Sequence, residues 1–328
     1  MPRFVKNFCR TGIRPRQRHG MSRSEFVVVA ASLLTVMSIG IPSLMQVRAK
    51  SRRQFCELRL ARLGVALQQF EAEFAEFPGF QNRKQQAPPS GTGPAGWAAT
   101  VLPYLTSTSG ENPPRPDRSF GTAEYVAELN CPATGAQAGP VLKYVANCGM
   151  PDAPRPPWDF RANGVFLNRV SGIDHVDRGY LQRHDGESST LLLSENLDAG
   201  RWTDNDEYTT GFVWRAAFRE GIPAPGRELF GINQHAEAGG SVEPSRLARP
   251  SSHHPRGVNY LMADGSTGFL EERIDYLVFV QLMTPDDEGT IVPETGEPPP
   301  APYRRPPSGA ATSTIPGLSG GQTAWREP

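Results

Sequence analysis

The chain has 328 residues, with 34 Lys and Arg against 34 Asp and Glu, and 38% of its residues are hydrophobic. This composition is sufficient for one sizeable hydrophobic core, and it excludes protein classes that depend on a strong net charge. The Arg-rich stretches lack interleaved aromatic residues and any recognised reading motif, so we expect no nucleic-acid partner.

The amino-terminal end combines a basic segment with an uncharged run. Residues 1–20 are rich in Arg and end at Gly20, Glu25 follows, and residues 26–45 carry no charge. At about 1.5 Å per helical residue, this run matches the roughly 30 Å core of a bilayer. We therefore expect a leader at 1–20 and a single transmembrane helix at 21–45. Basic residues are nearly balanced on the two sides of the run, so they do not set its orientation.

The order of a basic leader, Gly20, Met21, Glu25 and an apolar run resembles a type IV prepilin signal. The resemblance implies cleavage by prepilin peptidase between Gly20 and Met21, methylation of the new terminus, and residence in the bacterial cytoplasmic (inner) membrane with the head on the periplasmic or extracellular side. It also implies that Glu25 pairs with the amino terminus of a neighbouring subunit during assembly. Residues 22–24 depart from the pattern, because these positions are mostly apolar in prepilins. An uncleaved anchor with an interfacial Glu25 and an ordinary signal peptide remain alternatives.

The helical pattern continues beyond the apolar run. Large apolar residues recur at spacings of three and four until Pro78 and Gly79, which end helices; they are Leu60, Leu63, Leu67, Phe70, Phe74 and Phe77. One helix from about Arg23 to Phe77 is therefore predicted. Its second part, at 46–78, is an amphipathic spine that packs on a globular head.

Residues 79–284 are expected to form this head, which is rich in β-strands. Short apolar or β-branched runs are separated by Gly, Pro, Asn and Asp, as in antiparallel sheets; the runs are 141–145, 164–167, 190–193, 212–214, 258–263 and 267–270. Asp264-Gly265 lies between the last two runs and predicts a tight hairpin turn. The predicted fold class is α+β and pilin-like, with a mainly antiparallel sheet. Residues 285–328 are rich in Pro and Gly and predict a disordered tail.

Four cysteines are present, of which Cys9 lies in the leader. Cys131 and Cys148 flank a short segment rich in Gly and Pro, and they are the first choice for a disulfide in an oxidising compartment. Cys56, at the start of the soluble part of the helix, is an alternative partner for either of them, and the sequence does not decide between these pairings. No CxxC or Cys/His spacing indicates a zinc site.

His254, nine intervening residues and then Asp264-Gly265 resemble the H-x9-DG signature of the DUF1559 family, whose members often carry a prepilin-type segment. Other matching motifs follow in order over roughly 20–284, at the Cys56 region, 77–78, 131–132, 144–149, 163–166 and 185–196. The resemblance implies no catalytic residue, because the biochemical role of the family is largely unassigned. From the residue types, we expect His254 to cap or hydrogen-bond a strand entry and Asp264 to form the turn.

We expect that the chain is not an enzyme. His253, His254, Asp264 and Glu195 offer groups for a metal or acid–base site, but no catalytic spacing, nucleophile elbow or phosphate loop accompanies them. No cofactor is predicted, although the oxygen-rich run at 204–207 keeps calcium as an alternative.

These features predict a structural function. The chain is expected to be a membrane-anchored, pseudopilin-like subunit, processed by prepilin peptidase, that assembles with itself or other pilin-like subunits through its amino-terminal helix in a type II secretion or type IV pilus-like system. The alternative is a permanently anchored periplasmic head that binds a glycan or calcium and does not polymerise. Trp158, Trp202 and Trp214 are the aromatic candidates for a glycan platform, although a Trp in a β-rich head is more often packed.

Overall fold

A computed structural model gives the fold of the chain. It describes residues 22–83, 94–107, 125–135, 137–154, 159–170, 174–215, 218–219, 222–223, 231–234, 247–293 and 295–299. The chain divides into two compact units, Met1–Lys50 and Ser51–Pro328. The boundary between them falls inside the first helix, so each unit is described by itself.

Helix α1 runs from Arg23 to Phe74, close to the helix expected from Arg23 to Phe77. Its first turn is closed by a capping box, in which the Ser22 N–H donates to Glu25 Oε2 at 2.7 Å and the Glu25 N–H donates to Ser22 Oγ at 3.2 Å. At the other end, Ala75 adopts a positive φ of 57°, which ends the regular helix shortly before Pro78.

The first part of α1 requires a correction. Among the described residues, no helix has both the length and the apolar character that crossing a membrane requires. The transmembrane helix expected at 21–45 is therefore wrong, and so is the single-pass inner-membrane placement that depended on it. The expectation rested on the absence of charge, whereas Ser32, Thr35 and Ser38 place hydroxyl groups inside the run, each donating to a backbone carbonyl of the helix at 2.8 Å.

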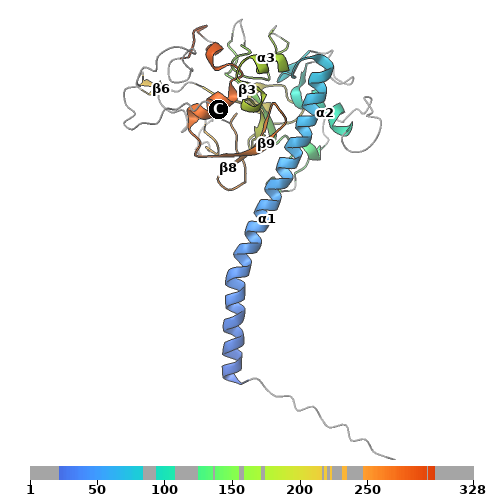
Figure 1. Ribbon diagram of the computed structural model, residues 1–328. Coiled ribbons are helices and arrows are strands. Elements are labelled where there is room, and N and C mark those ends of the chain that lie inside the picture. Colours follow the sequence, from blue (N-terminus) through green and yellow to red (C-terminus); the bar gives the residue numbers. More distant parts are fainter. Residues whose placement is uncertain are drawn as a thin grey trace, which may run out of the picture. The chain divides into compact units, whose positions relative to one another are not determined.

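A five-stranded sheet forms the centre of the second unit, in the order β5-β3-β4-β8-β9; β3, β8 and β9 are labelled in Figure 1. Its strands are β3 (Tyr144–Gly149), β4 (Leu191–Glu195), β5 (Gly211–Val213), β8 (Gly257–Met262) and β9 (Thr267–Glu271). Neighbours are antiparallel except β3 and β5, which are parallel. The sheet is therefore mixed, with one parallel pair beside three antiparallel pairs, because the chain crosses over between β4 and β5 instead of returning by a hairpin.

Shorter elements surround this sheet. Among the described residues, the other α-helices are α2 (Trp97–Ser107), α3 (Arg178–Arg183), α4 (Glu207–Thr210) and α6 (Tyr276–Met283). Two-stranded pairs are formed by β1 (Gln81–Asn82) with β2 (Ala95–Gly96), and by β6 (Phe218–Arg219) with β7 (Ile222–Pro223). Single 3-10 turns are η2 (Ala127–Leu129), η3 (Pro132–Thr134), η4 (Glu187–Ser189) and η6 (Asp287–Gly289).

The two faces of the sheet are both covered. One core cluster contains the buried stripe of α1, including Leu60, Leu63 and Leu67, together with residues of α2 and one face of the strands. The other cluster contains Phe279 and Val280 of α6 with the opposite side chains of the strands. Because side chains alternate along a strand, this arrangement makes three layers with the sheet in the middle.

The carboxyl-terminal boundary lies later than expected. Residues 285–293 and 295–299 are ordered, and the side chains of Asp287 and Thr290 are buried. The Asp287 N–H donates to Asp185 Oδ2 at 2.7 Å, and the Thr284 hydroxyl donates to the Asp287 carboxylate. The disordered tail predicted from 285 is therefore wrong for residues 285–293 and 295–299, because these polar contacts tie the segment to the head. Residues 300–328 lie outside the described residues.

Candidate functional site

The residues singled out at the amino terminus are only partly described. Gly20 and Met21, the expected cleavage site, lie outside the described residues. Glu25 belongs to the capping box of α1, and its carboxylate is exposed. The hydrogen bonds from the Ser22 backbone and side chain lower the pKa of Glu25, so it stays ionised.

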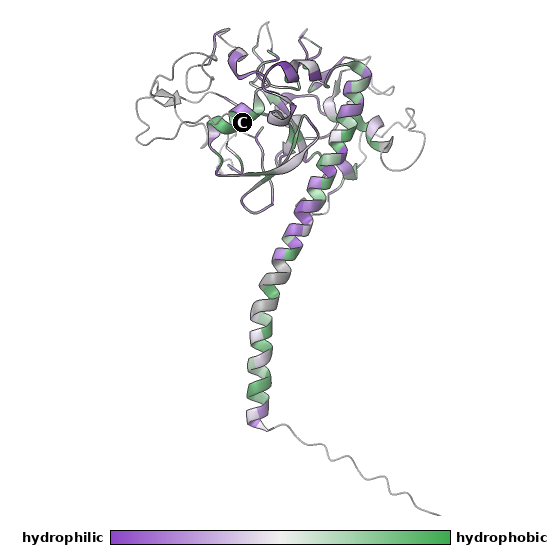
Figure 2. Ribbon diagram, in the orientation of Figure 1, coloured by the Kyte–Doolittle hydropathy of each residue, from purple (hydrophilic) through white to green (hydrophobic). Residues whose placement is uncertain are grey.

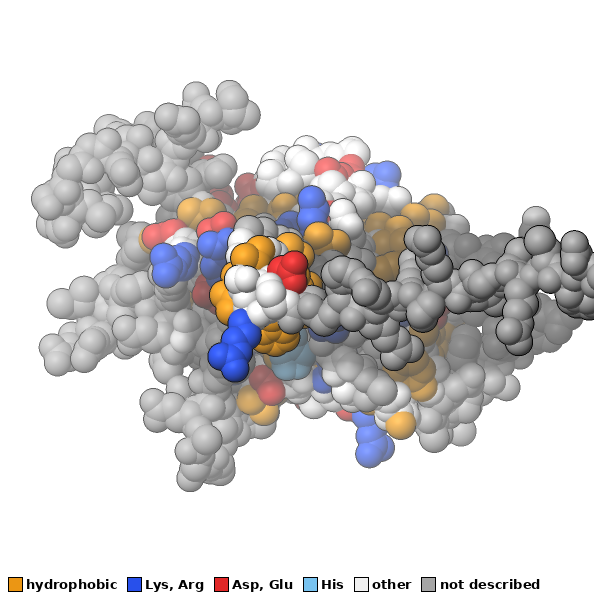
Figure 3. Space-filling model, turned by 90° about the horizontal axis from the view of Figure 1, so that it is seen from below, with side chains coloured by type: hydrophobic (Ala, Val, Ile, Leu, Met, Phe, Trp, Pro, Cys, Tyr) orange, Lys and Arg blue, Asp and Glu red, His pale blue; other side chains and the backbone are white. Residues whose placement is uncertain are grey.

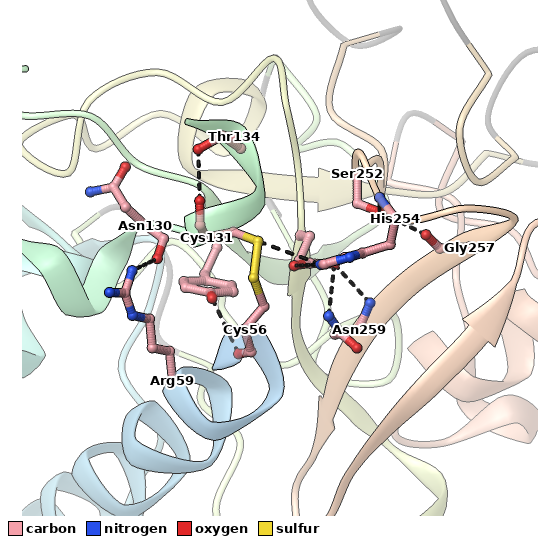
Figure 4. The surroundings of a disulfide bond; sticks show 11 residues. Cys56, Arg59, Asn130, Cys131, Thr134, Ser252, His254, Gly257 and Asn259 are labelled. Atoms are coloured by element: carbon pink, nitrogen blue, oxygen red, sulfur yellow. Dashed lines mark hydrogen bonds and ion pairs between the residues drawn. A yellow bond between two sulfur atoms is a disulfide. The ribbon is translucent and has the colours of Figure 1, made fainter. Parts of the chain in front are cut away.

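A disulfide joins Cys56 of α1 to Cys131, which directly precedes η3 (Figure 4). The pairing of Cys131 with Cys148 that the sequence favoured is therefore wrong, and the alternative partner Cys56 takes its place. The reason is that β3 carries Cys148 into the core, where it is a free buried thiol. Its sulfur fills the space that a Cβ on Gly211 of β5 would occupy.

His254 and Glu195 lie beside this disulfide. His254 Nε2 is 3.5 Å from Cys131 Sγ and 3.2 Å from Glu195 Oε1. Both residues are almost fully buried, with exposed fractions of 5% for His254 and 1% for Glu195. Figure 4 shows that the imidazole points from its loop toward the sulfur pair. A buried His–Glu pair and two sulfur atoms therefore share one small volume of the core.

Neighbouring groups fix the orientation of this pair. Glu195 Oε2 accepts hydrogen bonds from the Asn259 backbone N–H at 2.9 Å and from Asn259 Nδ2 at 3.2 Å, so only Oε1 is directed at His254. The His254 N–H donates to Ser252 Oγ at 3.0 Å, and that hydroxyl donates to the Gly257 carbonyl at 2.7 Å. These contacts hold the loop before β8 against the end of β4.

The four side chains form a potential ligand set. One ligand atom from each of Cys56, Cys131, Glu195 and His254 lies within 4.8 Å of the other three. Sulfur, imidazole nitrogen and carboxylate oxygen are the donors that zinc uses in proteins. In the disulfide form, the two sulfur atoms are bonded to each other and are not thiolate ligands.

The two ends of the H-x9-DG motif have different structural roles. His254 precedes β8, whereas Asp264 and Gly265 follow it, so the motif spans the length of that strand. Asp264 Oδ1 accepts a hydrogen bond from the Ser266 N–H at 2.8 Å, and Gly265 has a φ of 88°. Asp264 and Gly265 thus form the β8–β9 turn, while His254 belongs to the buried cluster. The sequence made Glu195 a candidate for a metal or acid–base site, although no motif spacing pointed to it. In the structure, Glu195 is the partner of His254.

The acidic run at 204–207 has structural partners. Asp204 Oδ2 accepts from the Arg201 N–H, and Asp206 caps α4 by accepting from the Tyr208 and Thr209 N–H groups. The run therefore forms a turn and a helix cap, rather than a ring of oxygens around one point. Of the glycan candidates, Trp202 and Trp214 are buried, and Trp158 lies outside the described residues.

Glu207 turns inward toward two other carboxyl groups. The Asp152 N–H donates to Glu207 Oε2 at 3.1 Å, and Asp159 is buried nearby. Burial, with repulsion from Asp152, raises the pKa of Glu207 to about 8. Burial raises the pKa of Asp152 to about 6 and also raises the pKa of Asp159. Glu207 therefore holds its proton in the folded chain near neutral pH.

A family model described as a protein of unknown function (DUF1559) matches residues 45–277, which is more than half of the chain. The chain belongs to the DUF1559 family. The matched segment of this DUF1559 protein includes all four residues of the Cys56 cluster. Searches of curated proteins and of solved structures give no match.

A second group of motif residues in the DUF1559 protein is structural. The backbones of Gly149 and Gly164 touch, because a Cβ on Gly164 would lie 2.4 Å from the Gly149 nitrogen. Asn147 Nδ2 donates to the Leu191 and Met283 carbonyls at 2.8 and 2.7 Å. The 144–149 and 163–166 motifs therefore meet at one crossing, where Asn147 ties β3 to β4 and α6.

Proposed function

We propose that this DUF1559 protein is a pilin-like structural subunit that assembles with other copies of itself through the amino-terminal part of α1. The observation that supports it is an exposed apolar surface on this segment. Eight large apolar residues there have exposed fractions from 47% to 69%; they are Phe26, Val27, Val28, Val29, Leu33, Leu34, Val36 and Met37. Figure 2 shows this stretch of α1 as predominantly hydrophobic.

The apolar residues surround the helix rather than forming one stripe. Successive residues of an α-helix are about 100° apart, so the four residues at 26–29 cover its whole circumference. A helix that is apolar on all sides is normally buried. Figure 3 shows hydrophobic side chains at the molecular surface with charged side chains beside them. Large exposed apolar surfaces of this kind mark interaction sites.

A second copy of the chain is the partner that matches this surface. Each copy carries the same helix with the same exposed apolar surface. Association of two identical helices therefore buries the apolar surface of both copies in one contact. The hydroxyls of Ser32, Thr35 and Ser38 already bond to their own backbone, so they bring no unpaired donor into a helix–helix contact.

Glu25 supplies a charge that sets the register of such contacts. Its carboxylate is exposed and ionised at the start of the apolar surface. If prepilin peptidase cuts after Gly20, as the leader pattern indicates, the new amino group of Met21 in a neighbouring copy is the complementary charge. Processing after Gly20 is part of this proposal, and amino-terminal sequencing of the mature protein, with a start at Met21 expected, tests it.

The assembly is tested by sedimentation velocity of the full chain against the Leu34→Glu variant. Leu34 is 69% exposed, so the substitution leaves the fold of the chain intact and places a charge in the proposed helix contact. We expect large assemblies for the unmodified chain and a shift to smaller species for the variant. Val170→Glu is the matched control, because Val170 is an exposed apolar residue of the other unit. Equal sizes for all three chains contradict the proposal.

A further inference from the structure

We propose that Cys56, Cys131, His254 and Glu195 form a binding site for a zinc-class metal ion when the disulfide is reduced. The centre then has two states: a disulfide in the oxidised chain and a four-ligand metal site in the reduced chain. This inference concerns the buried cluster in the unit Ser51–Pro328 and is independent of the assembly proposed above.

The distances in the oxidised chain already approach those of a metal site. Tetrahedral zinc with bonds of about 2.0–2.3 Å keeps its ligand atoms roughly 3.3–3.8 Å apart. His254 Nε2 lies 3.5 Å from Cys131 Sγ and 3.2 Å from Glu195 Oε1, and all four ligand atoms lie within 4.8 Å of one another. The two sulfur atoms are bonded to each other and have to separate, by rotation of the cysteine side chains, when the ion binds.

The ligands come from four separate places in the fold, and Glu195 is held by neighbouring groups. Cys56 lies on α1, Cys131 precedes η3, Glu195 ends β4, and His254 lies in the loop before β8. Asn259 holds Glu195 Oε2 through two donors, so that Oε1 faces His254 Nε2 within the cluster. This is the outer support that metal-binding carboxylates usually receive. A metal ion at this point therefore links the same elements that the disulfide links.

Thiol–disulfide exchange with a dithiol converts the oxidised chain into the reduced chain. A dithiol reductant transfers two electrons and two protons to the Cys56–Cys131 disulfide and becomes a disulfide itself. The divalent ion then displaces the two thiol protons, and His254 offers the lone pair of Nε2 with its proton on Nδ1. Two thiolates and one carboxylate leave one negative charge around the ion. The guanidinium of Arg59 donates to the carbonyl of Asn130, the residue before Cys131.

Cobalt(II) substitution tests the site in the full chain. The protein is reduced anaerobically with a phosphine, freed of the reductant and titrated with Co²⁺. We expect one ion per chain, a sulfur-to-cobalt charge-transfer band in the near ultraviolet, tetrahedral visible bands, and displacement of cobalt by Zn²⁺. The oxidised chain should show none of these signals.

Variants assign the ligands. Cys131→Ser removes one of the two thiolate ligands and should weaken the charge-transfer band, and His254→Ala should reduce affinity at least tenfold. Cys148→Ala is the matched control and should keep the full spectrum, because Cys148 lies outside the cluster. Cobalt binding without a sulfur band, the same spectrum in Cys131→Ser, or no stoichiometric binding overturns the proposal.

The reduced chain without metal has to be checked for folding, and far-ultraviolet circular dichroism provides that check. If reduction unfolds the chain, recovery of the native spectrum on adding one equivalent of Zn²⁺ supports the site, because metal binding then drives folding. A reduced chain that stays unfolded in the presence of Zn²⁺ and binds none of it counts against the site.

Discussion

His254 and Glu195 meet in the core with 3.2 Å between Nε2 and Oε1, although 59 positions separate them in the sequence. The antiparallel pairing of β4 with β8 causes the contact, because it places the end of one strand beside the start of the other. The Cys56–Cys131 disulfide lies against the same imidazole. These contacts join α1, the sheet and the loop before β8 at one buried point.

Glu195→Ala should destabilise the protein more than Glu195→Gln. The alanine leaves the Asn259 N–H and Nδ2 groups buried without their acceptor, at a cost of about 1–3 kcal/mol for each group. Glutamine keeps a carbonyl oxygen that accepts from Asn259. The free energy of unfolding, measured in urea for both variants, checks this difference.

His253→Ala is the control for this comparison, since His253 is the exposed neighbour of His254. We expect a change within about 0.5 kcal/mol for it, as for other surface substitutions. Equal losses for Glu195→Ala and Glu195→Gln would show that the Asn259 hydrogen bonds are unimportant.

The three described cysteines should differ sharply in their chemistry. A peptide map of the unreduced protein should contain Cys56 linked to Cys131. Cys148 should react with iodoacetamide only after unfolding, because it is fully buried and burial raises the pKa of its thiol. Loss of the disulfide in Cys131→Ser should lower the free energy of unfolding by about 2–5 kcal/mol.

Cys148→Ala provides the comparison, because it removes a buried sulfur without breaking the link, and it should cost less than Cys131→Ser. A peptide that links Cys131 to Cys148, or rapid alkylation of Cys148 in the folded protein, contradicts the arrangement of the core.

Stability should fall as the pH rises from about 5 to 8, because Glu207 keeps its proton in the folded chain while the unfolded chain loses it. The pKa of Glu207 is raised from 4.5 to about 8, so its stabilising contribution is complete below pH 4.5 and is lost as the pH rises through 8. The slope is at most about 1.4 kcal/mol per pH unit for one proton. Asp152, with a pKa raised to about 6, adds to the early part of the decrease.

Glu207→Gln should flatten this dependence, since glutamine accepts the Asp152 N–H bond without a proton to lose. Glu271→Gln, an exposed substitution on β9, should leave the dependence unchanged. The free energy of unfolding, measured in urea at pH 5, 7 and 9, distinguishes the two variants. If its pH dependence in Glu207→Gln is the same as in the unmodified chain, Glu207 is not buried and protonated.

Elements with local signals were predictable from the sequence. The spacing of Leu60, Leu63 and Leu67 gave the buried face of α1, and Asp264-Gly265 gave the β8–β9 turn. The run at 164–167 was predicted as a strand, but the N–H groups of Val165 and Phe166 both donate to the Asn147 carbonyl instead of forming a ladder. Periodicity identifies apolar runs and does not reveal such crossings.

Long-range relationships were not available from the sequence. Cys131 is closer in sequence to Cys148 than to Cys56, yet the fold pairs it across 75 positions. The His254–Glu195 contact depends on the order of strands in the sheet, and no local sequence pattern indicates that order. The absence of charge at 26–45 suggested a membrane span, but charge alone does not measure the apolar character of a helix.

Photo-cross-linking from position 34 is the most direct test of assembly through α1. A benzophenone amino acid replaces Leu34, and a second chain carries it at Val170 as a control. We predict that irradiation of the Leu34 protein gives a product of twice the mass of the chain, with the cross-link between segments 22–50 of two copies, and that the Val170 protein gives little. Absence of that product, or equal yields from the two positions, would contradict the proposed assembly.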